Sequence, residues 1–180
     1  MTTLEIPDQG YVTTEREAIA RHLTARGIIF DRWDASRPLP EDATQDDVLG
    51  AYAHALDPYM KENGYHTADV IRVQPNMDDI DAMRAKFLDE HTHSEDEVRF
   101  FVEGKGAFWF HLDGDDPVFC VVCEAGDFIS VPAGVKHWFD MGASPRVTAI
   151  RVFTNKEGWV PAYTESGISK GYNKPYEAAL

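Results

Sequence analysis

The segment from residue 90 to residue 101, EHTHSEDEVRFF, places two histidines, several carboxylates and an arginine before a phenylalanine pair. In an extended chain, residues two apart share a face, so His91 and His93 can point to one place. Glu97 can reach that place if residues 94–96 bend. Two neutral imidazoles and a carboxylate suit a divalent transition metal with open positions. The histidine pair alone could equally belong to a solvated loop, but Glu97 before an aromatic strand favours the metal.

A second segment, GDFISVPAGVKHWF, contains another histidine in a comparable setting. A strand that leaves Gly126 is expected to turn at residues 132–134 and to return with His137 at the head of an aromatic strand. This geometry can bring His137 to the place where His91 and His93 meet. The two segments together are therefore predicted to supply three imidazoles and one carboxylate to a single cation.

The first half of the chain is predicted to be mainly helical, because apolar residues recur there at helical spacing. Capping boxes are expected at Thr14 with Glu17 and at Thr44 with Asp47. Pro58 is expected to interrupt the second helix. The predicted helices span residues 13–27, 44–64 and 76–91, and a strand is predicted over residues 65–73.

From Glu97 onward the sequence period changes to two, and short stretches rich in valine, isoleucine and aromatic residues alternate with turn residues. Helices followed by a run of antiparallel strands indicate an α+β domain built on a β-barrel or sandwich, with the helices mainly in the N-terminal half. The tail after residue 160 shows no clear period. The predicted strands span residues 97–104, 106–112, 117–131, 136–141 and 146–154.

Length and charge limit the classes of protein and partner. At 180 residues with no long linker, one domain over residues 1–180 is expected. The formal net charge of −14 disfavours nucleic acid and anionic membrane surfaces as partners. The sequence shows neither an apolar run of about 20 residues, as a membrane span needs, nor a secretory leader at its start. A cytoplasmic protein is therefore expected.

The two cysteines, Cys120 and Cys123, lie three residues apart in a predicted strand. This spacing separates their Cα atoms by about 10 Å, whereas a disulfide needs less than about 7 Å. It also points the two side chains to opposite faces of the strand. We expect both to be small buried residues rather than a redox pair or a zinc site.

The two histidine segments resemble the paired motifs of the cupin superfamily, which has a jelly-roll β-barrel. Glu97 is followed at the expected distance by Gly104, and the second motif is matched by Gly126, Pro132, Gly134 and His137. Two positions depart from the general pattern, because Ala85 replaces a glycine and Met141 an asparagine. Over a longer stretch, EHTHSEDEVRFFVEGKGAFWFHL with VPAGVKHWFDMG closely resembles the acireductone dioxygenase family of methionine salvage.

The resemblance implies that His91, His93, Glu97 and His137 bind one Fe(II) or Ni(II) per chain. The implied substrates are dioxygen and the enediol 1,2-dihydroxy-3-keto-5-methylthiopentene. The iron form of the family yields formate and 4-methylthio-2-oxobutanoate, and the nickel form yields formate, carbon monoxide and 3-methylthiopropanoate. The resemblance also suggests a monomer. Neither the metal loaded in the cell nor the residue that takes the substrate proton follows from the sequence.

Further site residues also follow from the resemblance. Arg99 matches an arginine that stabilises the substrate dianion, although an ordinary surface ion pair would also explain it. Glu90 and Asp96 match positions tied to metal loading and to the relay of conformational change, and they could equally be solvated acidic residues. Aromatic residues that could line a pocket for the methylthio group are Phe101, Phe108, Trp138 and Trp159. The remaining histidines, expected to be structural or exposed, are His22, His54, His66 and His111.

Two other functions remain open on the sequence alone. The chain could be a cupin enzyme of different chemistry, either an isomerase or a dioxygenase acting on another small molecule. It could also be a cupin without catalytic activity that binds a small ligand. The presence of all four metal-ligating residues disfavours this last reading.

Overall fold

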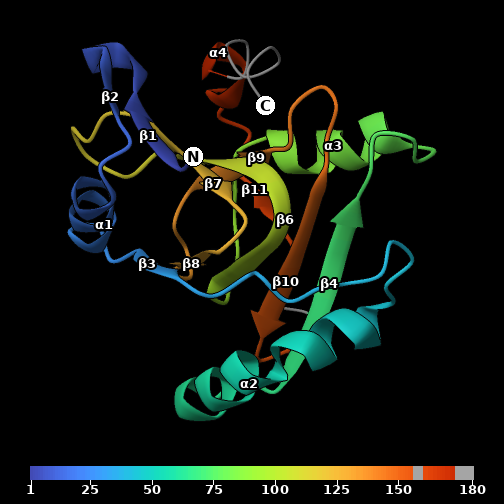
Figure 1. Cartoon of the computed structure of the whole chain (residues 1–180). Helices are drawn as coiled ribbons and strands as arrows, with labels where there is room; N and C mark the ends of the chain where they lie inside the picture. The colour runs from blue at the N-terminus through green and yellow to red at the C-terminus, as the bar shows by residue number, and fades with distance from the viewer. Residues whose placement is uncertain (156–159, 173–180) are drawn as a thin grey trace.

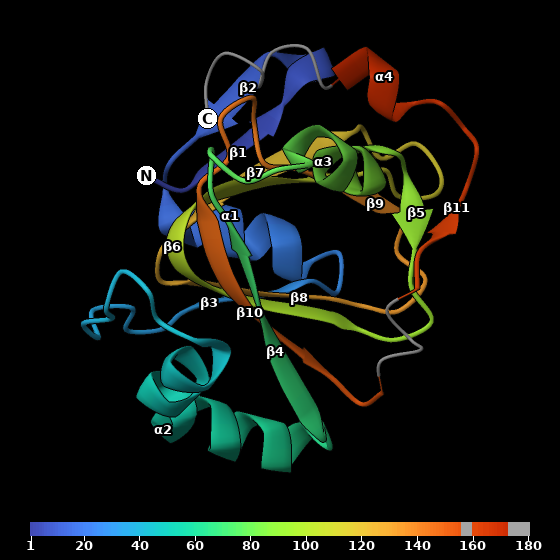
Figure 2. The same cartoon turned by 90° about the vertical axis from the view of Figure 1, so that its right-hand side faces the viewer.

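The computed structural model describes residues 1–155 and 160–172. Its antiparallel strands form two sheets that share the long strand β6 (Figures 1 and 2). The first sheet has the order β11 (Ala162–Tyr163), β5 (His91–Thr92), β9 (His137–Asp140), β6 (Glu97–Phe110), β7 (Phe119–Glu124), β1 (Thr3–Ile6) and β2 (Tyr11–Thr13). The second sheet joins β4 (Thr67–Val73), β10 (Val147–Phe153), β6, β8 (Asp127–Val131) and β3 (Ile29–Arg32).

The helices lie mainly in the N-terminal half, as predicted for this α+β architecture. The long helix α2 covers the outer face of the second sheet (Figure 2), while α3 packs beside β9. The helical elements are η1 (Pro7–Gln9), α1 (Arg16–Thr24), α2 (Gln45–Asn63), α3 (Ile80–Leu88) and α4 (Ser169–Tyr172). Among the described residues, no helix is both long and apolar enough to cross a bilayer.

Strand β6 corrects the prediction of two strands separated by a turn at residues 104–106. The strand runs without interruption from Glu97 to Phe110 and bends, so that its first half pairs in the second sheet and its second half in the first. Gly104 permits the bend, because its φ of +76° is in the left-handed region and a Cβ there would overlap the Arg146 carbonyl. The curvature is visible in Figure 1. The glycines therefore redirect the strand instead of reversing the chain.

The helix ends agree only partly with the predictions. The Thr44–Asp47 capping box is present at the start of α2. Pro58 does not interrupt this helix, which continues to Asn63 while its apolar face packs on the second sheet. The predicted box at Thr14 is also wrong: α1 begins after Glu15 and has no side-chain cap. Tertiary packing, more than capping, therefore stabilises the helices here.

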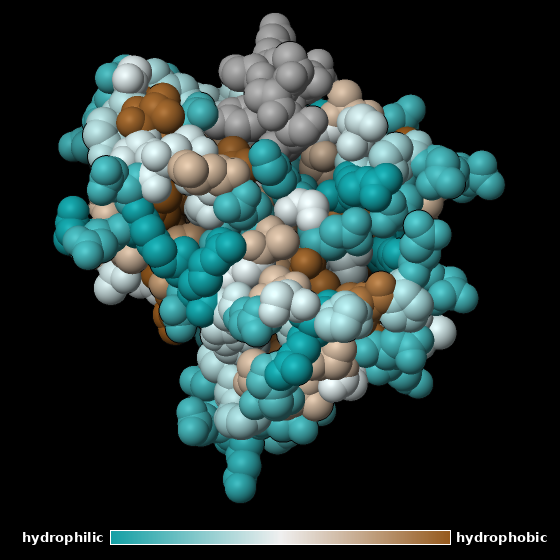
Figure 3. Space-filling view, in the orientation of Figure 1, coloured by the Kyte–Doolittle hydropathy of each residue, from teal (hydrophilic) through white to brown (hydrophobic). Residues whose placement is uncertain are grey.

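Three apolar clusters follow from this arrangement. The largest lies between the two sheets and contains Phe101, Phe108 and Phe139. A second lies between the second sheet and α2, and a third covers the outer face of the first sheet around Trp109 and Trp138. Polar residues cover most of the surface seen in Figure 3, in keeping with the net charge of −14.

The two cysteines are buried and form no disulfide with each other, as predicted. The side chain of Cys123 packs in the core between the sheets, whereas Cys120 packs in the cluster on the outer face of the first sheet. The alternation of side chains along β7 therefore points them in opposite directions. Burial also raises the pKa of the Cys123 thiol well above its usual value, which keeps it protonated and unreactive.

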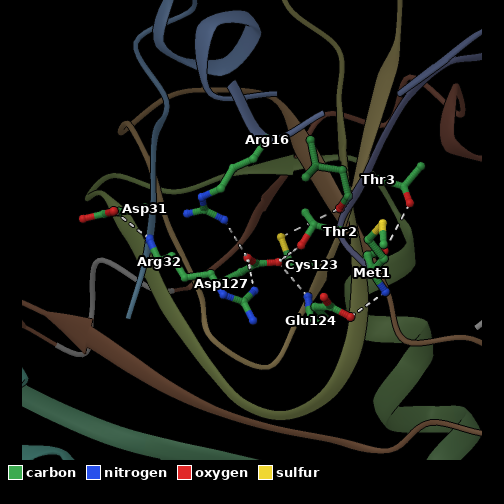
Figure 4. A network of polar contacts seen from close by, with 10 residues as sticks. Met1, Thr2, Thr3, Arg16, Asp31, Arg32, Cys123, Glu124 and Asp127 are labelled. Atoms are coloured by element: carbon green, nitrogen blue, oxygen red, sulfur yellow. Dashed lines mark hydrogen bonds and ion pairs between the residues drawn. The ribbon is translucent and has the colours of Figure 1, made fainter. Parts of the chain in front are cut away.

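A buried carboxylate at the start of β8 joins several elements of the N-terminal half (Figure 4). Asp127 is fully buried and accepts hydrogen bonds from Thr2 Oγ1 at 2.5 Å, Glu124 N at 2.9 Å and Arg32 Nη1 at 3.0 Å. Arg16 Nη1 lies 3.6 Å away. These donors offset the cost of burying the charge, so Asp127 has a structural role.

His22 on α1 is predicted to make stability depend on pH. Its ring packs edge-on against Phe119, and burial, followed by the charge of Arg26, lowers its pKa from 6.5 to about 4. Because the unfolded chain then binds the proton more tightly, acid favours unfolding between these two pKa values. When the pH is lowered from 6.5 to 4, the free energy of unfolding should fall by about 2 kcal/mol less in a His22→Gln variant than in wild type. Urea unfolding at the two pH values measures this difference. Parallel pH profiles for the two proteins would contradict this assignment.

Candidate metal centre

Strand register brings the distant histidine segments together at one end of the first sheet. His91 on β5 lies directly opposite His137 on β9, and on its other side it pairs with Tyr163 on β11. His137 is also opposite Phe110 at the end of β6. Bends at residues 94 and 95 then return the chain to Glu97, as the sequence predicted.

The four predicted ligand residues converge on one point. One ligand atom from each of His91, His93, Glu97 and His137 lies within 4.8 Å of every other, and all four residues are buried. Glu97 Oε2 is 2.8 Å from His137 Nε2 and 3.1 Å from His93 Nε2. Three imidazoles and a carboxylate in this arrangement are donors suited to one divalent transition metal.

Backbone carbonyls orient two of the imidazoles. His91 Nδ1 lies 2.7 Å from the Asp89 carbonyl, and His137 Nδ1 lies 2.8 Å from the Val135 carbonyl. An Nδ1–H that donates to a carbonyl leaves Nε2 free to bind a metal. Burial, together with the neighbouring His137, lowers the pKa of His91 to about 4, so that its ring is neutral near pH 7. A neutral ring is the form that binds a metal.

Arg99 lies beside this cluster and is buried, in contrast to the surface ion pair considered from the sequence. Its Nη2 is 2.7 Å from Glu97 Oε1. Burial alone would raise the pKa of Glu97, but Arg99 and then His137 outweigh it and hold that pKa well below its usual value. The site therefore combines an ionised carboxylate with a guanidinium.

Aromatic rings surround the Arg99 guanidinium. Its Cζ lies 4.3 Å from the ring centre of Phe139, 5.1 Å from that of Phe108 and 5.7 Å from that of Phe87. Such ring faces attract a cation without neutralising it. Phe87 and Phe139 were missed in the sequence, where their spacing indicated only a helix face and a strand.

The aromatic residues suggested for a methylthio pocket divide into separate groups. Phe101 and Phe108 lie in the core between the sheets, where Phe108 contacts His137 and Arg99 and Phe101 packs against Phe108. Trp138 lies on the opposite face of β9 from His137 and stacks on Trp109, so the suggestion is wrong for this residue. Trp159 lies outside the described residues.

Glu90 connects the site to the C-terminal part of the chain. Its Oε1 accepts hydrogen bonds from Thr164 Oγ1 at 2.5 Å and Ser166 Oγ at 2.8 Å. Its Oε2 lies 2.6 Å from His111 Nδ1. Glu90 is thus buried and well bonded instead of solvated. His111, expected to be structural or exposed, lies beside the site, whereas His54 and His66 are exposed as expected.

Two neighbouring carboxylates hold other segments. Asp96 Oδ1 accepts a hydrogen bond from Ala133 N at 2.9 Å, and Tyr65 Oη donates to Asp96 Oδ2 at 3.3 Å. Glu95, which sequence reasoning missed, accepts hydrogen bonds from the backbone nitrogens of Thr154 and Asn155 at 3.1 Å and 3.3 Å. The acidic residues around the histidines therefore fasten the loop to three other parts of the chain.

The antiparallel β-sandwich and its buried cluster of three histidines and a glutamate define a metal-binding cupin. The family model described as "ARD/ARD' family" matches residues 8–161. The chain therefore belongs to the ARD/ARD' family, the acireductone dioxygenases.

Individual relatives agree with the family assignment. The acireductone dioxygenase of a Picosynechococcus species is 51% identical over 172 residues, covering 96% of this chain and 97% of that protein. The enzyme from an Enterobacter species is 51% identical over 160 residues, with 89% and 88% covered. A solved structure, acireductone dioxygenase from Bacillus anthracis with a cadmium ion in its active centre, superimposes with a TM-score of 0.82 at 30% identity. It covers 91% of this chain and 98% of the other.

Proposed function

We propose that this chain is a metal-dependent acireductone dioxygenase that cleaves 1,2-dihydroxy-3-keto-5-methylthiopentene with dioxygen in methionine salvage. The observation that carries the proposal is the buried cluster of His91, His93, Glu97 and His137, whose ligand atoms lie within 4.8 Å of one another. Sequence identities near 50% to curated acireductone dioxygenases support the choice of substrate.

The donor set fits Fe(II) or Ni(II), one ion per chain, with His91, His93, Glu97 and His137 as the residues that would hold it. An ion held by these four residues could also bind the adjacent oxygens of an enediol. The bound metal would orient the enediolate and mediate its reaction with dioxygen. Formate and 4-methylthio-2-oxobutanoate are the products proposed with iron, and formate, carbon monoxide and 3-methylthiopropanoate with nickel.

The other site residues would act on the substrate and on the ligands. Arg99 would stabilise the negative charge of the ionised enediol, because its guanidinium is held between a carboxylate and three aromatic rings. Glu90 and Asp96 would keep the ligand segments in place through their hydrogen bonds to Ser166 and Ala133.

We further propose that the enzyme is a monomer in the cytoplasm. The net charge of −14 supports the monomer, because like charges oppose the association of identical molecules. Light scattering during gel filtration would measure the mass, and a value above one chain of 20.3 kDa would contradict the monomer.

Metal loading followed by product analysis tests the function. Apoprotein is divided into three parts: one receives Fe(II), one receives Ni(II) and one stays metal-free. We expect dioxygen consumption only in the loaded samples and only when the enediol is present, with carbon monoxide released by the nickel sample alone. Equal consumption by the metal-free sample, or none by either loaded sample, would contradict the proposal.

A further inference from the structure

We propose that Tyr65 is a positioning residue for the metal centre, which acts through Asp96 to fix the two ligand segments against each other. The inference rests on the proposed function, since it gives a residue outside the four ligand residues a role in supporting the metal site. Tyr65 directly follows Gly64, the C-cap of α2, and belongs to neither ligand segment.

The two ligand segments meet at a small set of polar contacts. Gly134 N donates a hydrogen bond to the His93 carbonyl at 2.9 Å, and Ala133 N donates to Asp96 Oδ1, also at 2.9 Å. These bonds join the loop that carries His93 to the turn that precedes His137. The Asp96 carboxylate is therefore the side chain that connects the two segments at this point.

Tyr65 contacts the remaining oxygen of that carboxylate. Its hydroxyl donates to Asp96 Oδ2 at 3.3 Å, while Ala133 occupies Oδ1. A carboxylate bound at both oxygens is restrained in rotation, whereas one held by Ala133 alone can turn about its χ angles. The phenol thus restrains the orientation that Asp96 imposes on the turn before His137.

The ring of Tyr65 is itself held firmly enough for this role. It stacks on Tyr59, with ring centres 5.7 Å apart and planes 17° from parallel. Tyr59 in turn packs edge-on against Phe128 on β8, at 4.9 Å. Tyr65 N also donates to the Met60 carbonyl at 2.9 Å. This stacking would survive replacement of Tyr65 by phenylalanine. The variant removes the hydroxyl, and with it the bond to Asp96 and a hydrogen bond to the Tyr59 side chain.

A pair of matched variants separates positioning from general stability. Tyr65→Phe removes the bond to Asp96, whereas Tyr52→Phe removes a hydroxyl that donates to the Ala35 carbonyl at 3.0 Å, away from the ligand segments. Supporting partners of metal ligands are worth about 10- to 100-fold in metal affinity. Because Tyr65 acts through Asp96, we expect Tyr65→Phe to weaken nickel binding by about 10-fold, the lower end of that range, and Tyr52→Phe to leave it unchanged.

The measurement is the dissociation constant of Ni(II) in competition with a chelator, with no substrate present. Visible spectra of the Co(II)-loaded proteins report the ligand geometry, and we expect them to change in Tyr65→Phe but not in Tyr52→Phe. In an Asp96→Ala background, Tyr65→Phe should cause no further loss of nickel affinity, because the carboxylate that the hydroxyl contacts is already absent.

The outcomes distinguish this inference from the proposed function. Equal nickel affinities and cobalt spectra for wild type and Tyr65→Phe, or additive losses with Asp96→Ala, would overturn the positioning role alone. A wild-type protein that binds neither nickel nor cobalt would overturn the metal centre and, with it, the role of Tyr65.

Discussion

Replacement of His137 by alanine is expected to weaken binding of Fe(II) or Ni(II) by more than about 100-fold and to abolish enediol-dependent dioxygen consumption. Loss of a residue that merely supports a ligand already costs up to about 100-fold, so loss of a ligand itself should exceed that figure. His137 is also the metal-ligating residue that the second segment supplies, and its Nε2 lies 2.8 Å from Glu97 Oε2. Metal content after dialysis and chelator competition measure the effect.

A matched control for this variant is His54→Ala, which removes an exposed imidazole from α2. It should keep wild-type metal content and activity. Circular dichroism of both variants checks that the fold is retained. Stoichiometric metal in folded His137→Ala would show that this imidazole is not a ligand, and the coordination proposed above would then be wrong.

Replacement of Arg84 by alanine is expected to lower the free energy of unfolding by about 3 kcal/mol, within the range for breaking a buried ion pair. The guanidinium of Arg84 on α3 binds Asp140 on β9 through two contacts of 3.0 Å and 3.2 Å. Asp140 is fully buried, so its charge would lose its main counterion. Gly142 N still donates to Asp140 Oδ1 in the variant, so the expected loss is at the lower end of the range for a broken buried ion pair. Urea unfolding at pH 7 measures the change.

Arg151→Ala provides the comparison for this ion pair. Arg151 on β10 binds Asp69 on the edge strand β4 through a shorter pair of contacts, 2.7 Å and 2.6 Å. The side chains of Arg151 and Asp69 are each about one-fifth exposed, so water can solvate the Asp69 carboxylate after the arginine is removed. We expect a smaller loss, about 1 kcal/mol. Equal losses for the two variants would show that burial of Asp140 does not set the cost.

The convergence of the four ligand residues could be predicted because it depends on local rules. His91 and His93 share a face of an extended segment, and the hairpin before His137 carries its own turn residues. The continuous course of β6 could not be predicted in this way. Glycine is a typical turn residue, and only the close approach of the Arg146 carbonyl, just before the distant strand β10, shows that Gly104 bends a single strand.

The polar surroundings of the site were harder to predict for the same reason. Glu95 binds Asn155 and Glu90 binds Ser166, pairs separated by 60 and 76 positions. No spacing rule connects residues so far apart. At Pro58 a local rule gave the wrong prediction. Proline disfavours helix, but α2 continues through Pro58 because its apolar face packs on the second sheet.

The dependence of Glu90 on Thr164 and Ser166 has a consequence for biosynthesis. A growing polypeptide presents His91 and His93 long before His137 is translated, and the hydroxyl partners of Glu90 come later still. The pocket therefore reaches its final form only after residues 164–166 have been synthesised. Until then a nascent chain can present all four ligand residues, but it lacks the hydroxyl partners that hold Glu90 in place.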